Sequence, residues 1–178
     1  METYQIQIGD CVRNLPICPV SETLFVAGFV MLGDVELTHV CAEELLKLCP
    51  EHDVIVTPET KSIPLAHEMA RLGCGDYIVA RKSVKAYMQN PVFTEVRSIT
   101  TKGVQRLYLA QADYDKLQNK RVLIVDDVIS TGESLLALEK LLAQFSGQIV
   151  GRAAVLAEGD AAERDDIIFI QKLPLFFR

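Results

Sequence analysis

The segment VLIVDDVISTGES, residues 122–134, constrains the fold of this chain more than any other stretch. It begins with four consecutive aliphatic residues, Val122–Val125, a pattern typical of a buried strand in a parallel sheet that is covered on both faces. Two acids follow, Asp126 and Asp127, and a small hydroxyl-rich turn then runs into a segment with helical apolar spacing. A strand, a turn and a helix in this order predict an α/β domain with a mostly parallel sheet.

The turn after the two acids has the features of an anion site. Free backbone N–H groups and the positive end of a helix dipole point into it, Gly132 allows close approach, and the hydroxyls add donors. Acids beside a phosphate site indicate a ligand that carries hydroxyls next to its phosphate, as a ribose 5-phosphate does, with or without Mg²⁺. The alternative is a plain loop whose aspartates cap a helix and are solvated. Neither a Walker loop nor a GxGxxG fingerprint is present.

Composition narrows the class of protein. With 178 residues and 49% hydrophobic content, the chain is expected to form a single domain, residues 1–178. A net charge of −6 argues against a nucleic-acid surface. We expect no membrane partner and a cytoplasmic location, because no signal pattern or membrane-length apolar run is evident. The five cysteines are scattered, so neither a zinc site nor a disulfide framework is expected.

The remaining pattern alternates strands with helices. An edge strand at 4–8 and an irregular segment precede an apolar run at 24–32, read as a strand or a packed loop. Asp34 is a candidate N-cap for a helix that ends before Pro50. We expect further strands at 54–56, 77–80, 148–157 and 167–170, helices at 63–72 and from 135 to about 147, a one-turn connection at 113–120, an acidic loop at 158–166 and a packed apolar tail.

Two more polar segments follow predicted strands. Glu59, Thr60, Lys61 and Ser62 come after the strand at 54–56, and Arg81-Lys82 follows the strand at 77–80. In a doubly wound sheet these loops share one edge with the turn after Asp126-Asp127. The alternatives are a solvated turn with a helix cap at Ser62 and a solvated strand end at Arg81-Lys82.

A two-stranded ribbon between about 93 and 109 interrupts the alternation. Its polar tip lies at 98–103, and a long excursion of this kind is typical of an active-site lid, although an ordinary exposed hairpin would read the same way.

The motif at 122–134 resembles the signature of the type I phosphoribosyltransferases, and the loops are nearest to those of the adenine and xanthine (purine) group. The resemblance implies a small hood from about residues 1–33, with the C-terminal tail as a further candidate, and a flexible lid hairpin. It places the sugar 5-phosphate on Val128, Ile129, Ser130, Thr131, Gly132, Glu133 and Ser134, and pyrophosphate on Glu59, Thr60, Lys61, Ser62, Arg81 and Lys82. Ser62 departs from the glycine that is usual there, which is costly if the position needs a positive φ or a non-trans peptide.

The implied reaction transfers the 5-phosphoribosyl group of 5-phosphoribosyl 1-diphosphate (PRPP) to a purine nitrogen and releases pyrophosphate, as in purine salvage. The resemblance implies catalytic roles for Asp126, Asp127 and Lys102, Mg²⁺ bound mainly through PRPP, no dedicated metal site in the protein, and a homodimer. Phe25 or Phe29 could stack on the base, although an aromatic residue in an apolar run is more often part of the core. The alternative function is a non-catalytic regulator that binds PRPP.

Overall fold

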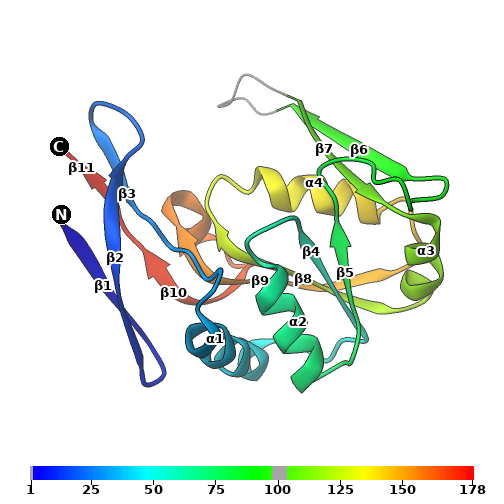
Figure 1. The fold of residues 1–178 in the computed structure, drawn as a ribbon, viewed down its shortest axis with the longest axis horizontal. Helices are drawn as coiled ribbons and strands as arrows, with labels where there is room; N and C mark the ends of the chain where they lie inside the picture. Colours follow the sequence, from blue (N-terminus) through cyan, green and yellow to red (C-terminus); the bar gives the residue numbers. More distant parts are fainter. Residues whose placement is uncertain (1, 98–103) are drawn as a thin grey trace.

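The computed structural model describes residues 2–97 and 104–178. Its centre is a five-stranded parallel sheet in the order β10-β9-β8-β4-β5 (Figure 1). The strands are β4 (Val54–Pro58), β5 (Tyr77–Ala80), β8 (Arg121–Ile129), β9 (Gln148–Glu158) and β10 (Ile168–Leu173). The predicted α/β fold with a parallel sheet is confirmed.

Helices cover both faces of this sheet (Figure 1). They are α1 (Val35–Leu48), α2 (Ile63–Leu72), α3 (Gln111–Leu117) and α4 (Glu133–Leu142). Alternate strand residues divide between two cores: Leu123 and Val125 pack in the cluster that holds α1 and α2, whereas Val122 and Ile124 pack in the cluster that holds α4. Side chains that alternate across a strand explain why the run at 122–125 is apolar throughout.

The sheet parts between β8, its middle strand, and the neighbouring strand β4. The chain runs outward from β4 to β5 on one side and from β8 through β9 to β10 on the other. Pairing of β8 with β4 stops at Ile124, whereas its pairing with β9 continues to Ile129. The carboxyl ends of β4 and β8 therefore form the switch point at which α/β sheets bind ligands.

A second, antiparallel sheet in the order β1-β2-β3-β11 lies beside the main one (Figure 1). It contains β1 (Thr3–Ile8), β2 (Cys11–Pro19), β3 (Leu24–Ala27) and β11 (Leu175–Phe177). These strands come from the residues that the sequence predicts as a hood. The prediction of an irregular segment before Pro19 is wrong, because residues 11–16 of β2 pair with β1 and residues 17–19 pair with β3, despite the two prolines of β2. The expected apolar strand is shorter, since β3 ends at Ala27.

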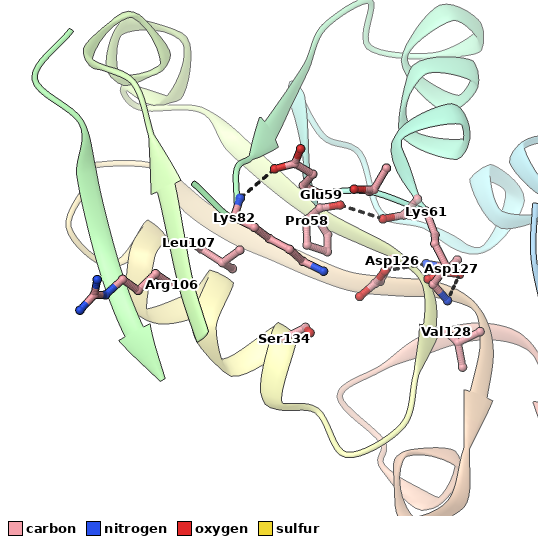
Figure 2. Close-up of a pocket in the computed structure, with 12 residues that line it drawn as sticks. Pro58, Glu59, Lys61, Lys82, Arg106, Leu107, Asp126, Asp127, Val128 and Ser134 are labelled. Atoms are coloured by element: carbon pink, nitrogen blue, oxygen red, sulfur yellow. Dashed lines mark hydrogen bonds and ion pairs between the residues drawn. The ribbon is translucent and has the colours of Figure 1, made fainter. Parts of the chain in front are cut away.

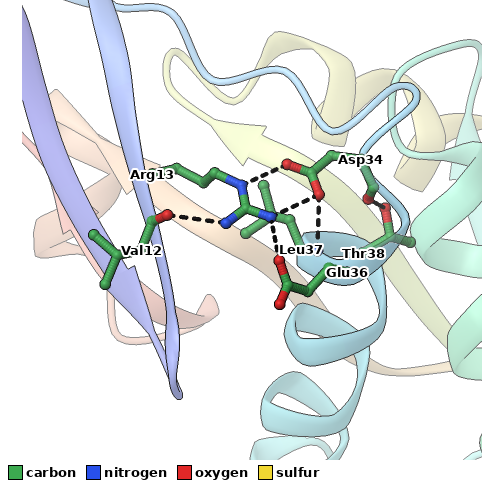
Figure 3. Close-up of polar contacts among 6 residues, drawn as sticks. All are labelled: Val12, Arg13, Asp34, Glu36, Leu37 and Thr38. Carbon is green, nitrogen blue, oxygen red and sulfur yellow. Dashed lines mark hydrogen bonds and ion pairs between the residues drawn. The ribbon is translucent and has the colours of Figure 1, made fainter.

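An arginine links this small sheet to the start of helix α1 (Figure 3). Arg13 on β2 donates from Nε and Nη2 to the carboxylate of Asp34 at 2.7 and 3.0 Å. Asp34 also caps α1, because its Oδ1 accepts from the N–H of Leu37 at 3.0 Å. The helix start and the small sheet are thus held by one carboxylate.

The predicted ribbon is present as β6 (Val92–Arg97) and β7 (Val104–Leu109), which pair antiparallel and lie over α4 (Figure 1). Its predicted tip at 98–103, with Lys102, lies outside the described residues. A 3₁₀ helix, η1 (Gly159–Glu163), occupies part of the expected acidic loop. None of the helices in the described part of the chain has the length and apolarity that crossing a bilayer requires.

Candidate active site

A cavity of about 660 Å³ lies at the carboxyl edge of the main sheet, where β4 and β8 part. Segments far apart in the sequence surround it: the loop after β4, the start of the loop after β5, the end of β8 and the ribbon strand β7. Its lining comprises Pro58, Glu59, Thr60, Lys61, Ser62, Lys82, Arg106, Leu107, Asp126, Asp127, Val128 and Ser134. Polar segments that the sequence places at one sheet edge thus meet in a single cavity.

The two aspartates lie inside β8 rather than after it, because pairing with β9 carries the strand on to Ile129. Alternation along the strand separates them: Asp127 is directed toward Lys61, and Asp126 toward the side where Lys82 and Ser134 lie (Figure 2). The Nζ of Lys61 is 2.7 Å from Oδ2 of Asp127, whose side chain is only 4% exposed. This ion pair offsets part of the cost of burying a carboxylate.

Asp126 is the perturbed carboxyl of the pair. Burial, followed by the neighbouring charge of Asp127, raises the pKa of Asp126 from its ordinary value of 3.8 to about 7. Its Oδ1 accepts the backbone N–H of Asp127 at 2.9 Å. Near neutral pH the carboxyl group of Asp126 in the unliganded site is therefore partly protonated. A bound cation or hydroxyl donor would favour its charged form.

The free energy of unfolding should depend on the protonation of Asp126. The folded-state pKa of Asp126 lies above the unfolded value, so the folded protein binds more protons between about pH 4 and pH 7. The free energy of unfolding then falls as pH rises through that window, by up to about 1.4 kcal/mol per pH unit. Urea titrations should show a smaller fall for Asp126→Asn than for the native chain, and an unchanged slope for the exposed control Asp165→Asn. A native slope no steeper than that of Asp126→Asn would contradict the shift.

A buried serine shapes the loop after β4. Ser62 is 1% exposed, its Oγ accepts from Thr57 Oγ1 at 2.8 Å, and it donates to the carbonyl of Pro58 at 3.2 Å. Its φ of −84° is in the right-handed helical region. The non-trans peptide joins Glu59 to Thr60 instead. The expected cost of a serine at position 62 therefore does not arise, because Ser62 has a backbone conformation that any L-residue adopts without strain.

Glu59 joins two of the loops. Its Oε2 accepts the backbone N–H of Lys82 at 2.8 Å, and its Oε1 is 3.3 Å from Nη2 of Arg81. The Lys82 N–H is the main cause that lowers the pKa of Glu59. The N–H and C=O of Arg81 are themselves bonded to Tyr108 of the ribbon. Glu59 thus positions the loop after β5, and the side chain of Lys82 extends across the cavity toward Asp126 (Figure 2).

The turn after β8 forms its own recess of about 40 Å³. This recess shares Asp126, Val128 and Ser134 with the lining of the main cavity. It is lined by Asp126, Val128, Ile129, Ser130, Thr131, Gly132, Glu133, Ser134 and Leu135. Gly132 is the N-cap of α4 with φ of +77° and no side-chain cap. Three hydroxyls and the first N–H groups of a ten-residue helix therefore surround a small recess, which is the arrangement that binds phosphate groups.

Comparison with known proteins agrees with this geometry. Residues 37–174 match the model of the family described as "Phosphoribosyl transferase domain". The chain belongs to this family. Its relatives named as adenine and hypoxanthine/guanine phosphoribosyltransferases are pentosyltransferases. An adenine phosphoribosyltransferase of Natranaerobius thermophilus is 31% identical over 158 residues, 85% of this chain and 86% of that protein. A hypoxanthine/guanine phosphoribosyltransferase of Methanococcus voltae is 30% identical over 72% of this chain and 65% of its own length.

A solved structure extends the likeness to the fold. The adenine phosphoribosyltransferase of Thermoanaerobacter pseudethanolicus superposes with a TM-score of 0.73 at 22% identity, covering 89% of this chain and 95% of the other. The fold of this chain is thus similar over most of its length to that of a solved adenine phosphoribosyltransferase.

The structure places the two predicted aromatic residues away from the cavity. Phe29 is 4% exposed and belongs to the core beside α1 and α2. Phe25 lies on β3, paired with Phe176, and the guanidinium of Arg178 sits 4.8 Å from its ring centroid. Phe29 therefore agrees with the core alternative of the sequence analysis, and base binding by Phe25, which does not line the cavity, stays a prediction.

Sequence reasoning also missed several residues at the cavity. Pro58 and Leu107 line it, as does Arg106, whose guanidinium turns outward to Glu95 (Figure 2). Burial raises the pKa of Glu158, at the end of β9, and the nearby charge of Lys61 offsets part of this rise. Only the strand-end position of Glu158 could have signalled its location.

The carboxylates fit a Mg²⁺ ion only in part. The described residues contain no cluster of three or more His, Cys, Asp or Glu side chains that could hold a metal by themselves. Mg²⁺ commonly binds through one or two carboxylates together with substrate phosphates. Asp126 and Asp127 can supply such oxygens in this phosphoribosyltransferase, provided that the substrate supplies the rest.

Proposed function

We propose that this protein is a purine phosphoribosyltransferase that transfers the 5-phosphoribosyl group of PRPP to adenine or a xanthine-type base and releases pyrophosphate. The observation that carries the proposal is the meeting, at one edge of the sheet, of a cavity lined by two adjacent aspartates and two lysines and a turn whose recess shares Asp126, Val128 and Ser134 with that cavity. These groups match the three parts of PRPP: its 5-phosphate, its ribose hydroxyls and its pyrophosphate. The homologous adenine phosphoribosyltransferase supports the choice of a purine.

Each part of the site has a role in this proposal. Ser130, Thr131, Gly132 and Ser134 hold the 5-phosphate, with the N–H groups that begin α4. Asp126 and Asp127 accept the ribose hydroxyls and tolerate the positive charge that develops on the ring as the bond from C1 to oxygen breaks. Lys61 and Lys82 neutralise the leaving pyrophosphate. Mg²⁺, when bound with PRPP, would supply further charge neutralisation on the pyrophosphate oxygens.

Lys61 has two different partners in this proposal, one before and one after PRPP binds. In the described structure its ammonium contacts Oδ2 of Asp127, the oxygen that would accept a hydrogen bond from a ribose hydroxyl. Once PRPP is bound, the hydroxyl replaces it and Lys61, half exposed, is free to contact pyrophosphate. The site thus exchanges one charge-assisted contact for two when PRPP enters.

Lys61→Gln should therefore separate the two halves of the ligand. We expect the Kd of pyrophosphate to rise about tenfold, a typical effect of losing one charged contact, while the Kd of ribose 5-phosphate is unchanged or falls. Calorimetry with each ligand measures both values. Lys85→Gln removes the same charge from a lysine whose Nζ donates to Ser83 and which does not line the cavity, so it is the control. Equal losses for both ligands in Lys61→Gln would contradict this exchange.

The reaction itself is tested with a panel of bases. The protein is mixed with labelled PRPP, Mg²⁺ and, separately, adenine, xanthine, hypoxanthine, guanine and orotate, and the nucleotide formed is measured. We expect nucleotide with a purine and none with orotate. Tight PRPP binding without turnover on any base would overturn the proposal in favour of the PRPP-binding regulator. The homodimer and the cytoplasmic location stay predictions.

A further inference from the structure

An arginine that has no role in the proposed mechanism lies against the turn that is proposed to bind the 5-phosphate. Arg164 follows η1 and precedes β10, more than thirty positions after Gly132 in the sequence. A Cβ built on Gly132 would lie 3.0 Å from Nη1 of Arg164. A recess of about 210 Å³, separate from the main cavity, is lined by Thr131, Gly132, Glu133, Leu135, Leu136, Glu139 and Arg164. The guanidinium thus lies against the turn whose other residues line the proposed phosphate recess.

A neighbouring carboxylate fixes the direction of this guanidinium. Arg164 donates from Nε to Oδ1 of Asp166 and from Nη2 to Oδ2, both at 2.8 Å. A two-point contact of this kind holds a guanidinium in one plane and uses one edge of it. The remaining nitrogen, Nη1, is the one that faces Gly132. Asp166 therefore directs Arg164 at the turn.

The charge of Arg164 matters because the turn is otherwise acidic. Among the described residues that line the two recesses beside the turn, Arg164 is the only cation, whereas Asp126, Glu133 and Glu139 are carboxyl groups; Glu139 is paired with Arg152, which lines neither recess. A phosphate that binds there meets these carboxyl groups as well as the helix dipole. The Arg164 side chain is 38% exposed, so its field reaches the turn but is weakened by salt.

We propose that Arg164, oriented by Asp166, is a positioning residue for the 5-phosphate: it packs against Gly132 and directs Nη1 at the turn, so that the positive end of the Arg164–Asp166 pair favours a bound phosphate dianion. This inference rests on the proposed function, since it takes the turn as the 5-phosphate site. It acts through the turn and makes no contact with the reacting atoms.

The test compares Arg164→Gln with the native chain by calorimetry with ribose 5-phosphate and with pyrophosphate, and by kinetics with PRPP. We expect the Kd of ribose 5-phosphate and the KM for PRPP to rise about five- to tenfold. The Kd of pyrophosphate, the kcat and the KM for the base should stay within about twofold, because Arg164 is remote from those parts of the ligand. Between 0.05 and 0.5 M KCl the loss should shrink, because salt screens an exposed charge.

Two further variants make the test decisive. Arg71→Gln removes the same charge from an arginine that makes a two-point contact with Glu68 on α2 and lines neither recess of the turn, and it should leave ribose 5-phosphate binding within twofold. Arg164→Lys keeps the charge but loses the two-point contact with Asp166 and the nitrogen that faces Gly132, so it should recover only part of the lost affinity. The inference is overturned if Arg164→Gln binds ribose 5-phosphate like the native chain, or if its loss is the same at both salt concentrations. Because ribose 5-phosphate binding needs no turnover, it is measured even if no base is accepted and the proposed function fails.

Discussion

Combining Asp127→Asn with Thr131→Ala is expected to lower kcat/KM for PRPP by more than about a thousandfold. The first change removes the charge of a carboxylate whose side chain is 4% exposed, and with it a charge-assisted acceptor for a ribose hydroxyl. The second removes a hydroxyl donor from the phosphate recess. Each loss falls on a different part of PRPP, so the two effects should nearly add.

Steady-state assays at several PRPP concentrations measure this effect, and thermal melts check the fold. Both substitutions nearly conserve shape, so the secondary structure should be retained. Asp165→Asn with Thr23→Ala makes the same chemical changes at exposed residues outside the cavity and should keep native activity. A folded Asp127→Asn, Thr131→Ala variant with more than a tenth of native kcat/KM would show that these groups do not bind the substrate.

Gly132→Ala should be the next most damaging change, with a KM for PRPP at least about thirtyfold higher. The φ of +77° at Gly132 is one that side chains with a Cβ adopt only at a cost of about 1–2 kcal/mol. The new methyl would also lie 3.0 Å from Nη1 of Arg164. The guanidinium can shift to relieve the contact, but the backbone strain remains, and its relief would turn the N–H groups of the turn away from the phosphate.

A second glycine separates strain from function. Gly75 has φ of +81°, and a methyl group added there would meet nothing within 4 Å, so Gly75→Ala carries the same backbone cost at a place remote from the cavity. Both variants should lose similar stability in urea titrations, while Gly75→Ala keeps the native KM for PRPP. If Gly132→Ala also kept the native KM, the turn would not be the phosphate site.

The sequence predicted the centre of the molecule because the physical signals there are local. Four aliphatic residues at 122–125 indicate a strand buried on both faces, and its neighbours at 54–56 and 77–80 follow the same rule. From parallel strands alone it follows that Glu59–Ser62, Arg81-Lys82 and Asp126–Ser134 share an edge. The structure adds that β8 and β4 part at Ile124, which creates the cavity.

Other features could not be predicted because they depend on contacts between distant segments. Strand β2 contains two prolines and forms only through its partners β1 and β3. Glu59 reads as a ligand contact in the sequence, yet its carboxylate is taken by the backbone of Lys82, 23 positions away. Phe25 and Phe29 have the same local pattern, and only packing shows that one is core and the other lies under Arg178.

Equilibrium binding of PRPP tests the central claim most directly, since it asks whether the cavity between β4 and β8 holds this ligand. Calorimetric titration with PRPP and Mg²⁺ should give one site per chain for the native protein and for Asp165→Asn with Thr23→Ala. For Asp127→Asn with Thr131→Ala, binding should be weaker by at least about a hundredfold. Native-like PRPP affinity in this folded double variant would contradict the account.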